Sequence, residues 1–237
     1  MRTKREPFKF KRFDVFQDRT AMKIGTDGVL LGAWTKTKKA ELILDIGTGT
    51  GLLALMLAQK TKAEIYAIEI DMEAVYQAKE NILNSSWAKQ ISLWNTSVQT
   101  YAHMTEDKFD LIVSNPPFFN SDKAETSREI ARQQGKLTFE ELTRDASSLL
   151  KEDGRFCIII PADSEEQFTS LAAQNGLFKN KTCKVFGNPN VTCKRVLLEY
   201  SKTKKELITE ELIIENEERH DYTAEYLKLV KDYMLFA

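Results

Sequence analysis

The chain has 237 residues, of which 42% are apolar and 29% charged, with a net charge of −1. This composition is typical of one globular domain with a full core and excludes a disordered chain. No apolar run reaches about 18 residues, and no apolar stretch follows the basic N-terminus, so we expect neither a membrane span nor a secretory signal. The cysteines Cys157, Cys183 and Cys193 form no CxxC pair, which fits a reducing cytoplasm.

Charge is unevenly spread along the chain. Residues 1–23 carry eight basic and three acidic side chains, and residues 179–205 carry eight basic and one acidic. Residues 206–237 reverse the balance, with three basic and nine acidic side chains. The two basic segments indicate either one anion-binding face or ordinary solvated surface.

The first forty residues form an extension before the regular part of the chain. Phenylalanines alternate with basic and polar residues over 8–18, which predicts a short strand or hairpin. Its phenylalanines either contact a nucleic acid or pack beneath the fold, and packing is favoured for most of them. A helix is expected over 25–34, with Thr26 as its N-terminal cap.

From residue 42 the apolar pattern alternates between strands and helices. Strands are predicted at 42–46, 64–70, 91–94, 109–114 and 155–160, and helices at 51–59, 72–84, 138–150 and 164–174. Thr138 and Glu141 have the spacing of a capping box. Near-continuous apolar strands separated by helices indicate a parallel sheet that is covered on both faces.

The pattern changes after residue 179. Three strands are predicted without intervening helices, at 181–186, 194–200 and 207–214, followed by a helix over 222–236. We therefore predict one α/β domain over 1–237, with the extension 1–40 and a core 41–237. The fold is a doubly wound, Rossmann-like, mainly parallel seven-stranded sheet with an antiparallel edge.

A glycine-rich loop follows the first predicted core strand. It reads DIGTGTG at 45–51, and Glu69 ends the second strand 20 residues after Gly49. Glycines allow close approach of a ligand, and an acid at that place can bind both ribose hydroxyls of an adenosine. A tight turn without a ligand is the alternative, and the position of Glu69 makes it less favoured.

Three adenosine-containing ligands could bind a loop of this kind. The glycine spacing departs from the dinucleotide fingerprint, because Leu52 stands where its third glycine would be. The Gly-Lys-Ser/Thr of a phosphate-binding loop is absent from the sequence. S-adenosylmethionine has no phosphate and suits Gly47, Gly49 and Gly51, with Asp45 positioning its cationic end.

A second motif, NPPF at 115–118, follows the strand predicted over 109–114. Ligands of open parallel sheets bind at the carboxyl ends of the strands, so the loop should face the glycine loop. Asn-Pro is also a common turn dipeptide. In the functional interpretation, the Asn115 side chain and the Pro116 carbonyl accept the two N–H groups of a planar amine. They would aim its lone pair at a methyl carbon, while Phe118 stacks on the target.

These motifs resemble those of class I methyltransferases that modify exocyclic amines of adenine or the amide of glutamine. The chain further resembles the bacterial valine-tRNA adenine-37 N6-methyltransferase family over nearly its whole length. The segments that carry this resemblance are FKFKRF at 8–13, DRTAMKIGTDGVLLGAW at 18–34, GLLALMLAQ at 51–59, AIEID at 67–71, RVLL at 195–198 and YMLF at 233–236.

The resemblance implies S-adenosylmethionine as cofactor and tRNA as partner, with the anticodon arm of tRNA(Val) as the site of modification. It implies cofactor contacts for the three glycines and Glu69, a catalytic role for Asn115, and cofactor-site positions for Thr26 and Asp27. Related enzymes usually carry an aspartate after the third strand. Ser97 stands there in this chain and can still bond the adenine amino group.

Other features of the sequence are less specific. His103 and His220 lack ligand spacing and are expected on the surface, so we expect no metal site. Residues 119–136 are polar, and they suggest either a flap whose Arg128 and Arg132 reach RNA or a solvated loop.

Four functions are compatible with these motifs. The leading hypothesis is N6-methylation of adenine in tRNA by a cytoplasmic monomer without membrane or metal partners. Glutamine-amide methylation is a close rival, although its enzymes generally carry an N-terminal helical domain. DNA adenine methylation usually needs a recognition domain. A non-catalytic RNA-binding module is the fourth, and the intact Asn115 and Glu69 argue against it.

Overall fold

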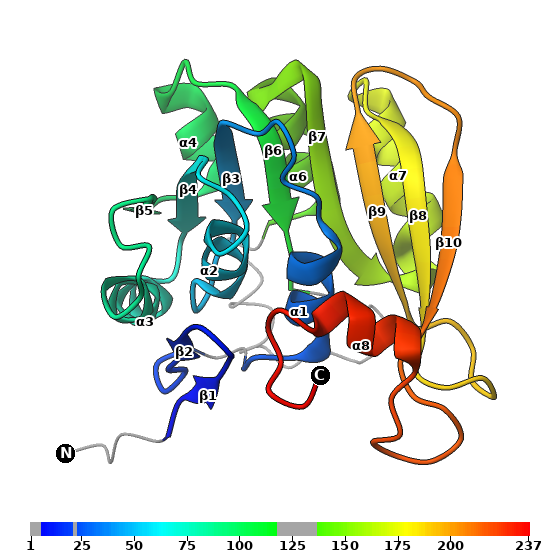
Figure 1. Ribbon diagram of the computed structural model, residues 1–237. Helices are drawn as coiled ribbons and strands as arrows, with labels where there is room; N and C mark the ends of the chain where they lie inside the picture. The colour runs from blue at the N-terminus through cyan, green and yellow to red at the C-terminus, as the bar shows by residue number, and fades with distance from the viewer. Residues whose placement is uncertain (1–5, 21–22, 118–136) are drawn as a thin grey trace, which may run out of the picture.

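The computed structural model describes residues 6–20, 23–117 and 137–237. Eight strands form one sheet in the order β10-β8-β9-β7-β6-β3-β4-β5, and helices cover both of its faces (Figure 1). The strands are β3 (Leu42–Ile46), β4 (Glu64–Glu69), β5 (Ile91–Asn95), β6 (Phe109–Ser114), β7 (Leu150–Pro161), β8 (Phe178–Phe186), β9 (Arg195–Ser201) and β10 (Ile208–Ile213). A separate hairpin joins β1 (Phe8–Lys9) to β2 (Asp14–Val15).

The predicted helices are present, but the structure adds one helix and shortens another. The helices are α1 (Thr26–Trp34), α2 (Leu52–Ala58), α3 (Met72–Leu83), α4 (Val98–Met104), α6 (Phe139–Leu149), α7 (Glu165–Gln174) and α8 (Ala224–Val230), with a 3-10 turn at Ala162–Ser164. The sequence pattern did not predict α4, because only Val98 and Tyr101 of its seven residues are buried, which is too few for a clear helical period. The expected helix over 222–236 is limited to α8, and the chain beyond it forms turns.

Alternating residues of the central strands enter two separate cores. Ile43, Leu111 and Ile159 pack with α1, α2 and α8 on one face of the sheet. Leu44, Ile112 and Ile158 pack with α4, α6 and α7 on the other. Because successive side chains of a strand point to opposite faces, strands that are apolar throughout require helices on both sides. The predicted doubly wound α/β class is confirmed.

The number of strands and the place of the antiparallel strand differ from the prediction. The sheet has eight strands instead of seven, and β9 lies antiparallel between β7 and β8 instead of at the edge. The edge strand β10 is parallel to β8. The chain that leaves β9 crosses to the other side of β8 before it forms β10, and Asn180 of β8 bonds to it there. The buried Asn180 side chain donates to Ser201 and to the Thr203 carbonyl and accepts from the Lys205 N–H. The chain leaving β9 is thereby held across the start of β8.

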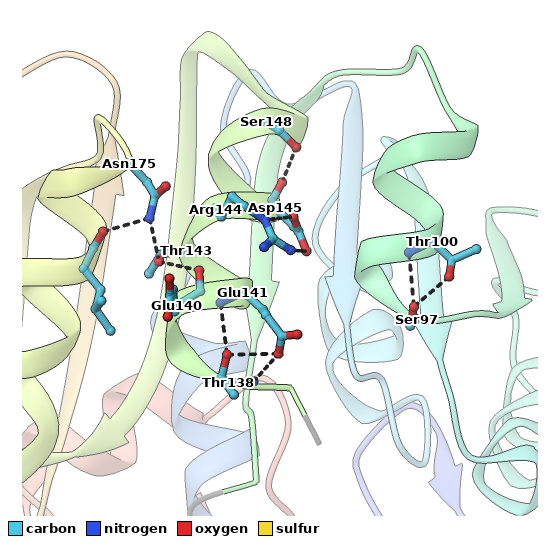
Figure 2. A network of polar contacts seen from close by, with 11 residues as sticks. Ser97, Thr100, Thr138, Glu140, Glu141, Thr143, Arg144, Asp145, Ser148 and Asn175 are labelled. Carbon is cyan, nitrogen blue, oxygen red and sulfur yellow. Dashed lines mark hydrogen bonds and ion pairs between the residues drawn. The ribbon is translucent and has the colours of Figure 1, made fainter. Parts of the chain in front are cut away.

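The capping interactions confirm one helix start and correct another. The Thr138 hydroxyl accepts from the Glu141 N–H, and the Glu141 carboxylate accepts from the Thr138 N–H, so the predicted capping box begins α6 (Figure 2). At α1 the N-cap is Gly25, with no side-chain cap, and Thr26 is the first helical residue. Thr26 therefore does not cap α1 as predicted.

The N-terminal hairpin is packed against the body of the protein. Phe10 and Phe13 are buried in the core that contains α1 and α8, so the packing interpretation is confirmed for these two residues. The Lys11 N–H donates to the Tyr233 carbonyl at 2.8 Å, and its ammonium donates to the Lys231 and Ala237 carbonyls. The two ends of the described chain are thus bonded to each other.

Gly154 in β7 provides a test of the central packing. A Cβ atom at this position would lie 2.8 Å from the Phe109 carbonyl oxygen and 2.9 Å from Leu150. We expect Gly154→Ala to lower the free energy of unfolding by about 1–3 kcal/mol, because backbone at this distance yields little. Urea unfolding would measure the change. Gly187→Ala is the matched control, since its Cβ would meet only Val191 at 3.7 Å, and an equal loss in both variants would contradict the prediction.

Candidate active site

A pocket of about 300 Å³ lies at the carboxyl ends of β3, β4 and β6. This is where open parallel sheets bind their ligands. Its lining includes the predicted site residues Gly47, Gly49, Glu69, Ser97, Asn115 and Pro116. The two motifs predicted to face each other, the glycine loop and the Asn-Pro loop, therefore line one cavity.

The glycine loop turns sharply between β3 and α2. Its first two glycines have positive φ angles of 71° and 56°, which other residues rarely adopt. A Cβ at either position would meet no atom within 4 Å, so the loop leaves open space there. The N–H groups of Gly47 and Thr48 donate to the Ile68 carbonyl and bind the loop to the end of β4. The two glycines line the pocket and leave the backbone there open to close approach of a ligand.

Glu69 is held in place by the main chain. Its Oε2 accepts from the Gly49 N–H at 2.9 Å, and its Oε1 accepts from the N–H groups of Ile70 and Asp71 at 2.9 and 3.0 Å. A carboxylate can accept about four hydrogen bonds, so three fixed donors orient Glu69 and leave acceptor capacity toward the pocket. This geometry suits recognition of a vicinal diol.

Asp45 is fully buried immediately before the glycine loop and is not part of the pocket lining. Its Oδ2 accepts from the Thr48 hydroxyl at 2.5 Å, and its Oδ1 has no partner among the described residues. Burial raises the pKa of this carboxyl to about 7, and the Thr48 hydrogen bond opposes part of that shift. The negative charge of Asp45 therefore appears only near neutral pH.

The raised pKa of Asp45 predicts a pH-dependent effect on stability. A pKa raised from 3.8 to about 7 means that stability is lost as pH rises through this interval, because the folded protein holds the proton more tightly. Asp45→Asn cannot ionise and keeps an acceptor for Thr48. We expect the unfolding free energy of the variant minus that of the wild type to be larger at pH 8 than at pH 5 by about 2 kcal/mol. Urea unfolding at both pH values measures this.

The exposed Asp14 supplies the control for that measurement. Asp14→Asn makes the same chemical change on the protein surface and is measured beside Asp45→Asn at both pH values. A stability change in Asp45→Asn that is the same at both pH values would contradict the assignment.

Asn115 is positioned by the strand before it. The buried Ser114 hydroxyl donates to the Ile46 carbonyl at 3.0 Å, which ties the end of β6 to the end of β3 beside Gly47. The Asn115 Oδ1 atom is buried and has no hydrogen-bond partner among the described residues. A Cβ added at Gly28 would lie 3.8 Å from Asn115 Nδ2, so α1 packs closely behind this side chain. An unpaired buried oxygen in a pocket wall is fitted to accept a hydrogen bond from a ligand.

Ser97 begins α4 at the opposite side of the pocket. Its hydroxyl donates to Thr100 Oγ1 at 3.0 Å and accepts from the Thr100 N–H at 3.1 Å (Figure 2). Because its hydrogen is already used in the cap, Ser97 retains only an acceptor lone pair. That matches a ligand amino group, which would donate to it.

Comparison with known proteins identifies the family. The model of the methyltransferase small domain matches residues 14–183. A tRNA1(Val) (adenine(37)-N6)-methyltransferase from Flavobacterium psychrophilum is 46% identical and covers 96% of this chain and 99% of its own length. The protein of the same name from Bacteroides fragilis is 42% identical, over 96% of this chain and 97% of its own.

The chain belongs to the tRNA1(Val) (adenine(37)-N6)-methyltransferase family. It is a methyltransferase, and the resemblance inferred from its motifs is confirmed.

Solved structures share the fold of this family member at lower identity. A predicted O-methyltransferase from Agrobacterium tumefaciens superposes with a TM-score of 0.69 at 19% identity, covering 87% of this chain and 96% of its own. A methyltransferase from Pyrococcus furiosus gives a TM-score of 0.56 at 21% identity, covering 81% and 90%. At this identity the likeness concerns the arrangement of the sheet and helices alone.

Some residues that the family resemblance assigned to the cofactor lie outside the pocket lining. Asp27 forms an ion pair with Arg195 at 2.8 Å and thereby ties α1 to β9, while Thr26 is exposed beside it. The third glycine, Gly51, has φ 83°, and a Cβ there would lie 3.6 Å from Ala78 on α3. The structure thus gives Asp27 an ion pair and Gly51 a packing contact, and their cofactor roles stay predictions.

Other pocket residues of this family member were not singled out from the sequence. Thr20, Asp71, Ala74 and Leu137 line the cavity. The position of Asp71, two residues after Glu69, was a usable signal, because the ends of neighbouring strands meet at one edge. The polar Thr20 lies in the DRTAMK segment and carries no signal of its own, since only the folded chain brings it to the pocket.

The remaining sequence assignments divide into three groups. The surface positions of His103 and His220 are confirmed, and Cys157 is buried in the core. Phe118 and residues 119–136, with Arg128 and Arg132, lie outside the described residues. The described part of the chain contains no helix long and apolar enough to span a membrane, and no cluster of three His, Cys, Asp or Glu side chains arranged for a metal ion.

Within the described residues, the hairpin of the first basic segment lies apart from the strands of the second. The hairpin and the β8–β9 region lie on opposite sides of α1 and α8 (Figure 1). Four basic residues of the second segment are in ion pairs with acids, namely Lys179, Lys181, Arg195 and Lys202. These ion pairs involve half of the eight basic side chains of the second segment.

Proposed function

We propose that this protein transfers a methyl group from S-adenosylmethionine to N6 of adenine 37 in tRNA(Val), next to the anticodon. It acts as a cytoplasmic monomer built as a single domain, without a metal. The observation that carries the proposal is the unpartnered Oδ1 of Asn115, which lies in the same pocket as Gly47, Gly49 and Glu69. The names of relatives that match almost the full chain at 42–46% identity support the substrate.

The pocket residues fit the cofactor. Gly47 and Gly49 leave open space beside the backbone, and Glu69 retains lone pairs for the ribose hydroxyls. Ser97 offers an acceptor to the adenine amino group of the cofactor. The cavity volume of about 300 Å³ lies within the range of small-molecule sites, roughly 300–1,000 Å³. Asp45, buried behind the loop, contributes negative charge for the cationic end when it is ionised.

When bound, S-adenosylmethionine supplies a sulfonium methyl group, and the C–S electron pair stays on sulfur as the new N–C bond forms. The Asn115 Oδ1 accepts one N6–H of the target adenine, and the Pro116 carbonyl accepts the other. Two acceptors draw the amine away from planarity and direct its lone pair at the methyl carbon. The N6 atom then loses one proton to water. Catalysis by these residues consists of positioning and electrostatics.

A broad basic cleft supports an RNA partner. It lies between the hairpin, the end of α1 and α8, and its cationic lining comprises Lys11, Arg12, Lys36, Lys38, Lys60, Lys228 and Lys231. The acids Glu210, Glu225 and Asp232 also line it, so the basic residues are in excess. Such a surface suits phosphate groups, and binding through it should weaken as salt rises.

The test is nucleoside mass spectrometry of tRNA incubated with the full-length protein and cofactor carrying a labelled methyl group. The expected result is labelled N6-methyladenosine at position 37 of tRNA(Val). A tRNA(Val) transcript with guanine at position 37 is the control and should remain unlabelled. Label in a protein glutamine, or in no tRNA, would overturn the proposed substrate.

A further inference from the structure

Two buried amide side chains project from α3 one turn apart. Gln77 and Asn81 are each 1% exposed, although amides are seldom fully buried without a structural reason. Neither belongs to the motifs of the proposed reaction, and neither lines the pocket. Gln77 Nε2 donates to the Glu80 carboxylate on the same helix, and the other partners of the two amides are main-chain groups from two distant parts of the sequence.

Asn81 binds the N-terminal segment and the glycine loop together. Its Oδ1 accepts from the Phe16 N–H at 2.9 Å, and its Nδ2 donates to the Phe16 carbonyl and to the Thr50 carbonyl, both at 2.8 Å. Both amide hydrogens are therefore used, and both main-chain polar groups of residue 16 are satisfied by one side chain. The third bond reaches the loop that contains Gly47 and Gly49.

The segment from Phe16 to Thr20 reaches the pocket at its last residue, Thr20. Gln77 Oε1 accepts from the Arg19 N–H at 3.1 Å, which binds this segment to α3 a second time. The Arg19 guanidinium also lies 3.8 Å from Glu73 and 5.9 Å from the centre of the Tyr76 ring, both on α3. Thr20 follows directly and lines the pocket with the two glycines.

The same face of α3 supports the end of the glycine loop. A Cβ at Gly51 would lie within 3.6 Å of Ala78 and 3.7 Å of Ile82, so the loop rests on the helix between the two amides. One helix face thus supports two segments that contribute to the pocket, and Asn81 bonds to both segments through Phe16 and Thr50. The opposite wall, with Asn115, is anchored separately through Ser114 and Ile46.

We propose that Asn81 is a positioning residue that sets the affinity for S-adenosylmethionine by holding segment 16–20 against the glycine loop. The inference rests on the proposed cofactor of this pocket. Because the Asn115 wall has its own anchor, loss of the Asn81 bonds should weaken cofactor binding and leave the rate at saturation nearly unchanged.

The test compares Asn81→Asp with wild type and with Asn84→Asp. The aspartate has nearly the same shape but replaces both donors with an oxygen that faces two carbonyls. We expect the Kd for S-adenosylmethionine, measured by calorimetry, to rise about tenfold or more, because buried acceptors are left unpaired. The kcat at saturating cofactor and the KM for tRNA should stay within about twofold. Asn84 is the exposed residue at the C-cap of the same helix, so its variant should match wild type in all three constants.

A second variant and a measurement on the wild type keep the proposal testable if Asn81→Asp folds poorly. Gln77→Met removes the acceptor for Arg19 and should also raise the Kd with kcat preserved. In the wild type, saturating S-adenosylmethionine should slow hydrogen exchange in peptides that span residues 16–20.

The outcomes separate this inference from the proposed function. A wild-type protein that does not bind the cofactor contradicts the proposed function itself. Wild-type binding together with an unchanged Kd in a folded Asn81→Asp variant overturns the positioning role. Hydrogen exchange at residues 16–20 of the wild type that is equally fast with and without the cofactor overturns the positioning role as well. A variant that loses thermal stability without any change in Kd also overturns it.

Discussion

Asn115→Ala is expected to lower kcat for tRNA methylation by about 100- to 1,000-fold, the usual cost of removing one preorganised hydrogen-bonding group from a transition state. The wild-type side chain places a buried, unpartnered oxygen in the pocket wall. Alanine removes this acceptor but leaves the glycine loop and Glu69 untouched. The Kd for S-adenosylmethionine should therefore stay within about threefold of the wild-type value. Single-turnover kinetics and calorimetry measure the two quantities separately.

Asn115→Asp distinguishes the acceptor role from a loss of packing against Gly28. It keeps an oxygen in the same place, so it should retain clearly more activity than the alanine variant. Equal loss in both variants would indicate that the amide acts through shape or through its N–H₂ group. Normal turnover in Asn115→Ala would remove the residue from the mechanism.

Glu69→Gln is expected to raise the Kd for S-adenosylmethionine by about 100-fold, because hydrogen bonds to a charged group contribute about 1.5–3 kcal/mol each. Three main-chain N–H groups converge on the carboxylate in the wild type. An amide must place its own N–H₂ against at least one of these donors, which disturbs Gly49 as well as the ribose contact. Calorimetric titration with the cofactor measures the effect.

Glu64→Gln provides the matched control, since Glu64 is an exposed carboxylate at the other end of the same strand. Its cofactor affinity should equal that of the wild type. If Glu69→Gln bound the cofactor as tightly as this control, Glu69 would have no part in the site.

Local sequence patterns predicted most of the architecture. The apolar strands and intervening helices from residue 42 onward are present, because each element buries its own face and leaves its period in the sequence. The relation between the glycine loop and the Asn-Pro loop also followed from the sequence. Both motifs come directly after parallel strands, and the carboxyl ends of such strands meet at one edge.

Long-range contacts decided the features that the sequence left open or misplaced. The pairing of β10 with β8 is one of them, and Asn180 bonds to the chain that leaves β9 toward it. The contribution of Thr20 to the pocket depends on amides of α3 that lie some sixty residues away in sequence. Likewise, the burial that raises the pKa of Asp45 comes from the packing around it.

The sequence by itself thus determined the alternation of elements and the motifs at the strand ends, since these depend on neighbouring residues. Only the tertiary structure decided the strand order at the edge of the sheet, the residues that complete the pocket and the ionisation of Asp45. Strand pairing, burial and hydrogen bonding join residues far apart in the chain, and no local pattern records their partners.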